Sequence, residues 1–344
     1  MDWFEKLTGF AEGPGSEGAA RTRQRLRLDG PQMQSLANGR SFGIGRLELV
    51  SLQDLRSRAQ AGPAVPGPRQ VRVVQGNVRE LHAQPANAGA LFQVASQFNL
   101  LEMIGPDVTP EQGVARYAGD PTQGPACAMA AGAATIYRNY LVPVEGQPGQ
   151  AHNRQLDGFA PLGTALAQGV QQPADSLWSM HNGYALFKPG AVARLSAHLQ
   201  TLDDSALDAL RARLCIGLHW DVEVTDAPTA PGPLVSQAFC SALPVAYHHG
   251  AARAAPWAPL ATLVLQAAYE ATLWAAVLNV QRGASRTVLL TLLGGGAFGN
   301  DNAWIEAALE HALARTAGHG LDVAMVSYRA PTPAHLQWVQ SLGV

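Results

Sequence analysis

Cysteine is scarce in this sequence. The chain has 344 residues and three cysteines, Cys127, Cys215 and Cys240, which lie far apart with no paired spacing. Zinc sites and disulfide frameworks use cysteines at short, regular spacings. The pattern argues against both, and we expect three reduced thiols in the core. The pair His248–His249 has no spaced carboxylates or further histidines beside it, so we expect neither a metal nor a cofactor.

An excess of positive charge is also missing. Lysine and arginine number 24 against 26 acidic residues, which gives a formal net charge of −2. A chain with this balance lacks the electrostatic footprint of a nucleic-acid or anionic-membrane binder, so any polyanion must be held locally. The first residues lack the basic-then-apolar order of a signal peptide. We therefore expect a cytoplasmic protein, with secretion as an effector as the alternative.

One long apolar run, residues 258–280, has the length of a membrane span. Gln266, Tyr269, Glu270 and Asn279 interrupt it, and it is rich in small residues. These features favour a helix packed closely inside an α/β layer structure over a membrane helix.

The remaining sequence alternates short apolar runs with helical patterns, which predicts an α/β fold with a parallel sheet. Residues 1–70 are richer in glycine, proline and arginine and predict a partly irregular extension with a strand near 45–50. Residues 144–172 read as a long insertion or loop. Strands are expected at 71–74, 91–95, 214–223, 235–245, 287–293 and 321–327. Helices are expected at 123–140, 191–200, 205–212, 258–281 and 302–314.

The most informative segment is Thr287–Glu306, where a β-branched apolar run passes through Gly294, Gly295 and Gly296 into a helix. Glycines let backbone N–H groups approach phosphate oxygens, and a helix N-terminus adds partial positive charge. A tight strand-to-helix turn in any α/β protein would use the same glycines. No Gly-Lys-Ser/Thr follows, so this is not a P-loop.

A second group of polar residues follows the expected strand at 91–95. Gln97 and Asn99 come at its end, and Glu102, Glu111 and Asp120 follow. Ligands of open α/β sheets bind outside the carboxyl ends of strands, which favours a site here. Asp120 also starts Asp-Pro-Thr-Gln, a capping box in which Asp120 is the helix N-cap and Gln123 its partner. A capping carboxylate can still turn one oxygen to a ligand, whereas isolated acidic residues are usually solvated.

Two further motifs have mainly structural interpretations. His181-Asn-Gly-Tyr184 is primarily a turn signal, although it could face a ribose or adenine. Tyr137, Arg138 and Asn139 come late in a helix, where an arginine suits the helix dipole and a tyrosine is commonly in the core.

The glycine segment resembles the second phosphate loop of macrodomains of the poly(ADP-ribose) glycohydrolase kind, in which an aromatic residue lies against the distal ribose. Together with Gln97-Phe-Asn-Leu-Leu-Glu102, Asp120-Pro-Thr-Gln-Gly-Pro and His181-Asn-Gly-Tyr184, it resembles an atypical macrodomain family over most of residues 71–328. That family includes bacterial effectors that remove ADP-ribose from arginine, with ubiquitin as one modified target. The resemblance implies a three-layer α/β/α macrodomain-like fold over residues 71–344. The Gly-Gly-Gly and consecutive glutamates of polymer-cleaving enzymes are absent after Asn99.

These observations predict an ADP-ribosyl hydrolase that cleaves the N-glycosidic bond between ADP-ribose and a protein side chain, arginine being favoured. Carboxylates would orient water and stabilise positive charge on the sugar. The alternative is a module that binds ADP-ribose without cleaving it; a phosphoesterase would need a metal or nucleophile that we do not find. The expected catalytic residues are Asp120, Glu102 and Glu111. The expected ligand-binding residues are Gln97, Asn99, Gln123, Gly294, Gly295, Gly296, Ala297, Phe298, Gly299 and Asn300.

Overall fold

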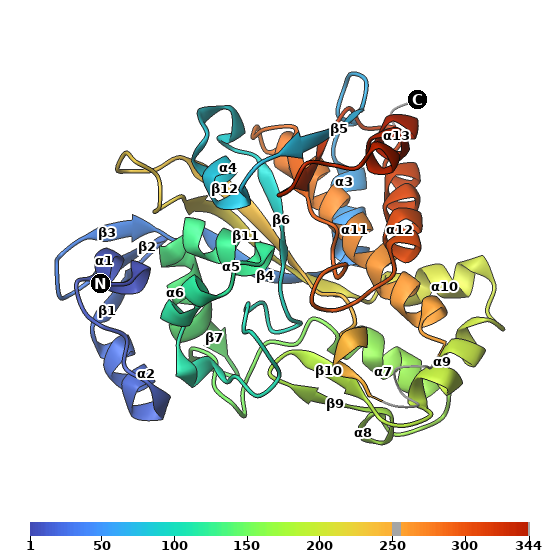
Figure 1. The fold of residues 1–344 in the computed structure, drawn as a ribbon, viewed down its shortest axis with the longest axis horizontal. Helices are drawn as coiled ribbons and strands as arrows, with labels where there is room; N and C mark the ends of the chain where they lie inside the picture. The colour runs from blue at the N-terminus through green and yellow to red at the C-terminus, as the bar shows by residue number, and fades with distance from the viewer. Residues whose placement is uncertain (250–255, 343–344) are drawn as a thin grey trace.

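The computed structural model describes residues 1–249 and 256–342 and is built around one mixed sheet (Figure 1). Within these residues β11 runs antiparallel to β4 and β12, and the other neighbouring strands are parallel. The expected α/β fold with a mixed, largely parallel sheet is confirmed. The seven strands are, in sheet order, β4 (Arg46–Ser51), β11 (Cys215–Glu223), β12 (Leu234–Cys240), β6 (Leu91–Ala95), β13 (Thr287–Leu290), β14 (Asp322–Ser327) and β5 (Gln70–Gln75).

Helices cover both faces of the sheet and complete the three expected layers. In β6, Leu91 packs into the cluster on one face and Phe92 into the cluster on the other. Burial on both faces explains why this strand is a continuous apolar run rather than an alternating one. One face carries α3 (Leu52–Ala61), α11 (Ala258–Gln281) and α12 (Asn302–Arg315), with α9 (Ala191–Leu199) packed on α11. The other face carries α4 (Val78–Ala83), α5 (Gln123–Ala130) and α6 (Gly132–Tyr140).

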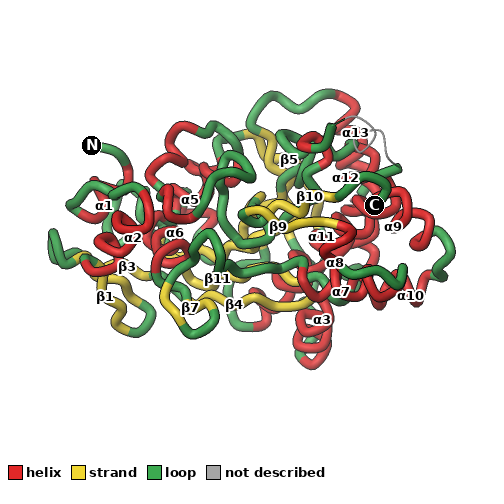
Figure 2. The backbone as a smooth tube through the Cα atoms, turned by 90° about the horizontal axis from the view of Figure 1, so that it is seen from below, coloured by secondary structure: helices red, strands yellow, loops and turns green. Residues whose placement is uncertain are grey.

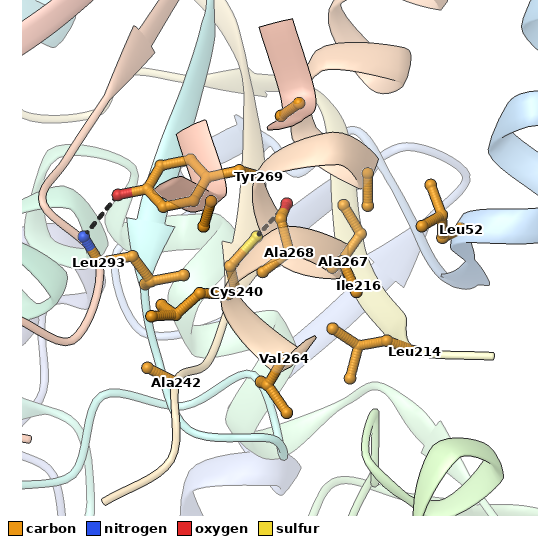
Figure 3. Packing of buried hydrophobic residues seen from close by; sticks show 14 of the residues in the cluster. Leu52, Leu214, Ile216, Cys240, Ala242, Val264, Ala267, Ala268, Tyr269 and Leu293 are labelled. Carbon is orange, nitrogen blue, oxygen red and sulfur yellow. Dashed lines mark hydrogen bonds between the residues drawn. The ribbon is translucent and has the colours of Figure 1, made fainter. Parts of the chain in front are cut away.

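The long apolar run forms α11 and lies in the core (Figure 3). In the described part of the chain it is the one helix long and apolar enough to cross a membrane, with a mean hydropathy of 1.3, and 89% of its apolar stretch is buried. Figure 3 shows Val264, Ala267 and Ala268 of α11 beside Ile216 of β11 and Cys240 of β12. The small residues let the helix pack closely on the sheet, so its hydropathy reflects a core position.

Residues 1–45 form a smaller unit at one end of the molecule (Figure 2). Phe4, Met33 and Phe42 share an apolar cluster with Ile136 and Tyr140 of α6. β4 and α3 also precede residue 70, yet they belong to the central sheet and its helical cover. The structure thus differs here from an extension that ends at residue 70. The unit contains α1 (Trp3–Thr8), α2 (Gly15–Gln24), β1 (Leu26–Asp29), β2 (Gln32–Ser35) and β3 (Ser41–Gly43).

Two expected segments differ in the structure. The helix expected over 123–140 is divided at Ala131, because the Gly132 N–H donates to Thr225 Oγ1 at 2.9 Å. The insertion expected at 144–172 contains a helix, α7, with Leu162 and Leu166 in the core. Further elements are β7 (Pro143–Val144), β8 (Gln147–Pro148), α7 (Ala160–Gly169), α8 (Ala174–Leu177), β9 (Trp178–His181), β10 (Tyr184–Phe187), α10 (Asp204–Arg211) and α13 (Pro333–Ser341). The 3₁₀ helices are η1 (Pro85–Asn87), η2 (Pro110–Gln112), η3 (Ala115–Gly119) and η4 (Val245–Tyr247).

Candidate active site

A cleft of about 740 Å³ opens where four neighbouring strands of the sheet end. Ala95, Ala242, Thr291 and Tyr328, which close or follow β6, β12, β13 and β14, all line it. Its volume lies within the range of small-molecule sites, and its place at the carboxyl edge of the sheet is where α/β proteins bind ligands. Of the expected residues, the cleft brings together Gln97, Glu102, Asp120, Gln123, Gly294, Gly296, Ala297 and Phe298.

The glycine loop, residues 293–300, forms one wall of this cleft. Gly294 has a φ of 77°, and a Cβ there would lie 2.5 Å from Ala242 Cβ, so the loop requires glycine at this position. A Cβ on Gly296 would meet no atom within 4 Å. In the described residues, the N–H groups of Gly296, Ala297 and Phe298 have no protein acceptor. The loop can therefore offer several adjacent donors to an anion in the cleft.

The core holds this loop in place. Tyr269 of α11 accepts a hydrogen bond from the Leu293 N–H at 2.9 Å (Figure 3). It also donates one to the Thr291 carbonyl at 2.6 Å. Asn300 is buried, and its amide donates to the Leu243 carbonyl at 2.9 Å. Asn300 thus supports the loop from behind and does not line the cleft. These hydrogen bonds to buried residues fix the position of the loop.

The helix after the loop does not contribute as expected. α12 begins at Asn302, and the carboxylate of Asp301 caps it by accepting the Ala303 N–H at 2.8 Å. A capped and negatively charged N-terminus is a poor anion site. Gly295 and Gly299 also lie outside the cleft lining, and a Cβ on Gly295 would approach buried Ile305. Anion binding here depends on the loop N–H groups.

Asp120 stands at the start of α5, where Thr122 and Gln123 also line the cleft. The expected capping box is wrong: Thr122 is the N-cap, and Asp120 accepts the Thr122 N–H at 2.9 Å from outside the helix. Gln123 instead accepts the Ala95 N–H at 2.9 Å and donates to the Gln93 carbonyl at 2.8 Å, which ties α5 to β6. No side chain caps α5, so its first N–H groups add partial positive charge beside the half-buried Asp120.

Glu102 is placed differently from Asp120. It lines the floor of the cleft, but its carboxylate has no exposed surface and accepts hydrogen bonds from Arg138 Nη2 at 3.2 and 3.4 Å. Arg138 also donates to the Leu100 carbonyl and lies 3.8 Å from the centre of the Phe239 ring. Burial raises the pKa of the Glu102 carboxyl to about 7, against the opposing effects of Arg138 and Tyr117. Glu102 and Arg138 form a buried ion pair beneath the cleft.

Glu111 and Asn99 do not line the cleft. The Glu111 carboxylate accepts the His152 N–H at 2.9 Å and contacts its imidazole at 3.0 Å. Burial acts to raise the pKa of Glu111, but the bonds from His152 outweigh it and the pKa is lowered. Asn99 is fully buried; it accepts the Leu101 N–H and donates to Gln155. Both residues have structural partners that account for their polarity.

An aromatic group completes the cleft. The rings of Tyr184, Tyr247 and Phe298 lie 5.2 to 5.7 Å apart between centroids. Gln97 donates to the Tyr184 hydroxyl, which donates to the Met103 carbonyl, so the ring is fixed. Tyr184 ends the expected Asn-Gly turn between β9 and β10, which is confirmed. Tyr247, Tyr328 and Arg329 also line the cleft and were not expected from the sequence. Tyr328 and Arg329 directly follow the strand β14, and this position was the one signal that could have indicated them.

A separate charged cluster on the other face groups Asp208, Glu270 and His311 in a geometry that could hold a metal ion. Arg56 already binds both carboxylates, with distances of 2.6 to 2.8 Å. Burial acts to raise the pKa of Glu270, but the bonds from His311, Arg56 and Trp274 outweigh it and lower it to about 2. The cluster is an ion-pair network that joins α3, α10, α11 and α12.

Neither a protein-family model nor a curated protein matches the sequence. Solved structures with a similar overall arrangement include poly(ADP-ribose) glycohydrolases. The enzyme from Thermomonospora curvata gives a TM-score of 0.46 at 14% identity, over 95% of this chain and 97% of that chain. The enzyme from Deinococcus radiodurans in complex with ADP-ribose gives 0.45 at 13% identity, over 95% and 98% of the two chains. Similarity this distant assigns no activity, which has to be argued from the residues of the cleft.

Proposed function

We propose that this chain is an ADP-ribosyl hydrolase that cleaves the N-glycosidic bond between ADP-ribose and an arginine side chain of a protein. The observation that supports this most is the pairing, across one cleft, of the unpartnered N–H groups of the glycine loop with the carboxylate of Asp120. The loop suits a diphosphate, and the carboxylate suits glycosidic chemistry. Ubiquitin is one candidate target, and the cytoplasm, or secretion as an effector, is the proposed setting.

In the proposed complex the N–H groups of Gly296, Ala297 and Phe298 bind the diphosphate. The ring of Phe298, braced by Tyr184 and Tyr247, packs on the distal ribose and brings its anomeric carbon toward Asp120. Asp120 accepts a proton from a water molecule as the oxygen of that water bonds to the anomeric carbon. The bond from this carbon to the guanidino nitrogen breaks, and the leaving nitrogen takes up the proton that Asp120 received, which restores the carboxylate.

Glu102 has a supporting part in this mechanism, because its buried carboxylate cannot touch the sugar. It keeps the floor of the cleft closed through its pair with Arg138. Asp120 is then the one carboxylate, among the three acidic candidates, that both lines the cleft and is partly exposed. The second candidate function is a module that binds ADP-ribose without cleaving it. Glycosidic hydrolysis commonly uses two carboxylates, and this cleft has one that is partly exposed, whereas binding needs only the loop.

The test measures release of free ADP-ribose from an arginine-ADP-ribosylated protein, together with binding of ADP-ribose by calorimetry. The Gly296→Glu variant places a carboxylate in the open space that faces the loop, and Gly318→Glu is the control at another glycine where an added Cβ would meet no atom within 4 Å. We expect release and binding by the parent and the control, with loss of both in Gly296→Glu. Binding without release would establish the reader, and no binding by the parent would refute the proposal.

A further inference from the structure

Exposed apolar side chains gather at the opening of the cleft. Ile104 is 57% exposed, Leu292 37% and Tyr328 75%, although each is a large hydrophobic residue. They follow β6, β13 and β14, three neighbouring strands, and all three line the cleft together with Arg329. We call Ile104, Leu292, Tyr328 and Arg329 the mouth surface. Few large hydrophobic residues of the described chain are this exposed, so their grouping at one opening needs an explanation.

The charge of the cleft limits what the mouth surface can bind. Among the described residues that line the cleft, Arg329 is the one cation. The acidic residues of the lining are Asp120 and Glu102, and Glu102 is already paired with Arg138. A chain of poly(ADP-ribose) leaving the cleft would place a diphosphate from each further unit beside Ile104, Leu292 and Tyr328. Dehydrating a diphosphate against apolar side chains is unfavourable, and one guanidinium cannot neutralise it.

A protein surface has the opposite character. Apolar side chains at the centre of an interface, with a charged residue at the rim, are the usual composition of a protein-binding patch. Ile104 and Leu292 would bury their exposed area against apolar neighbours of the modified residue, and Arg329 would pair with a carboxylate at the edge. The patch continues directly from the cleft, so a protein docked on it would have its modified side chain at the opening.

We propose that the mouth surface binds the folded protein that carries the ADP-ribose, at a site where apolar side chains and a carboxylate flank the modified arginine. The inference rests on the proposed function and narrows its substrate class to proteins carrying a single ADP-ribose. ADP-ribose itself is held by the glycine loop, so the mouth surface governs which protein is recognised and leaves the affinity for free ADP-ribose to the loop.

The experiment compares two substrates that share the scissile bond, an arginine-ADP-ribosylated protein and the small conjugate ADP-ribosyl-arginine. The variants are Ile104→Asn and Leu292→Asn, which remove the apolar surface without placing a negative charge near the diphosphate, with the milder Ile104→Ala to exclude an effect of misfolding. Leu36→Asn is the matched control, because Leu36 is 53% exposed and lies between β2 and β3, outside the cleft.

We expect the two asparagine variants to raise KM for the modified protein about five- to tenfold, the usual effect of losing an interface anchor. Ile104→Ala should act in the same direction with a smaller change. All variants should keep kcat/KM for ADP-ribosyl-arginine within about twofold of the parent, and Leu36→Asn should leave both substrates unchanged.

Two results would overturn the inference while leaving the proposed function intact. One is an equal loss on the protein and the small conjugate, and the other is removal of several units from free poly(ADP-ribose) as fast as from the modified protein. A parent that binds no ADP-ribose would instead remove the proposed function, and this inference with it.

Discussion

Replacing Arg138 with methionine should make the stability of this protein strongly dependent on pH. Burial raises the pKa of Glu102 from 4.5 to about 7, so the folded state holds this proton more tightly than the unfolded state does. Glu102 has no effect on stability below about pH 4.5; its cost grows as pH rises from about 4.5 to about 7 and is constant above that. The raise corresponds to about 3 kcal/mol at about 1.4 kcal/mol per pKa unit.

Arg138→Met removes the opposing charge and keeps apolar volume over Phe239. The pKa of Glu102 should rise further, so at about pH 8 the folded protein must hold a proton that the unfolded chain has released or bury an unpaired carboxylate. Either should cost about 3–5 kcal/mol of unfolding free energy. At about pH 5.5 Glu102 binds a proton and the cost should be small, because no charge is then left unpaired.

The assay is urea unfolding followed by tryptophan fluorescence at both pH values. Arg79→Met is the control, because Arg79 and Asp226 form a half-exposed pair whose loss should cost under about 1 kcal/mol at either pH. An equal loss of stability at both pH values in Arg138→Met would refute the coupling of Arg138 to the protonation of Glu102.

Three further predictions concern the glycine loop and Glu111. Gly294→Ala should destabilise the protein by about 1–3 kcal/mol and weaken ADP-ribose binding, because φ is positive and Ala242 leaves no room, whereas Gly296→Ala should be mild by thermal unfolding. Tyr269→Phe should lower ADP-ribose affinity and cost about 1–3 kcal/mol of stability, since it frees the Leu293 N–H; unchanged calorimetric affinity would count against a loop anchored by the core. Glu111→Gln should keep its rate of ADP-ribose release, since its carboxylate binds His152 away from the cleft, and a large loss of rate would return Glu111 to the mechanism.

The parts of the site that depend on local chain geometry could be predicted from the sequence. Glycines at positive φ mark the loop whatever surrounds them, and Gly294 needs that freedom. The carboxyl ends of β6 and β13 meet at one sheet edge because the strands are parallel, so Gln97 and the loop had to lie near each other. The Asn-Gly turn before Tyr184 is local in the same way.

The parts of the site that depend on residues distant in the sequence could not be predicted. Asp120-Pro-Thr-Gln satisfies a local capping rule, but Gln123 satisfies the backbone N–H of Ala95 instead, and this partner comes from another element. Glu102 meets Arg138 only through the packing of α6 under the cleft, so the sequence could not show that its carboxylate is buried. Tyr247 lies on a short 3₁₀ turn with no motif around it, and only the fold brings its ring to Phe298.

The most direct test of the central claim is single-turnover release of ADP-ribose from an arginine-ADP-ribosylated protein by the parent and by Asp120→Asn. Asparagine keeps an acceptor for the Thr122 N–H and removes the base. Asp107→Asn is the control, because Asp107 is an exposed aspartate outside the cleft in the same connection between β6 and α5. The account predicts that Asp120→Asn slows release about 100-fold or more, while its affinity for ADP-ribose stays near that of the parent. An Asp120→Asn protein that stays folded and releases ADP-ribose at the parental rate would contradict it.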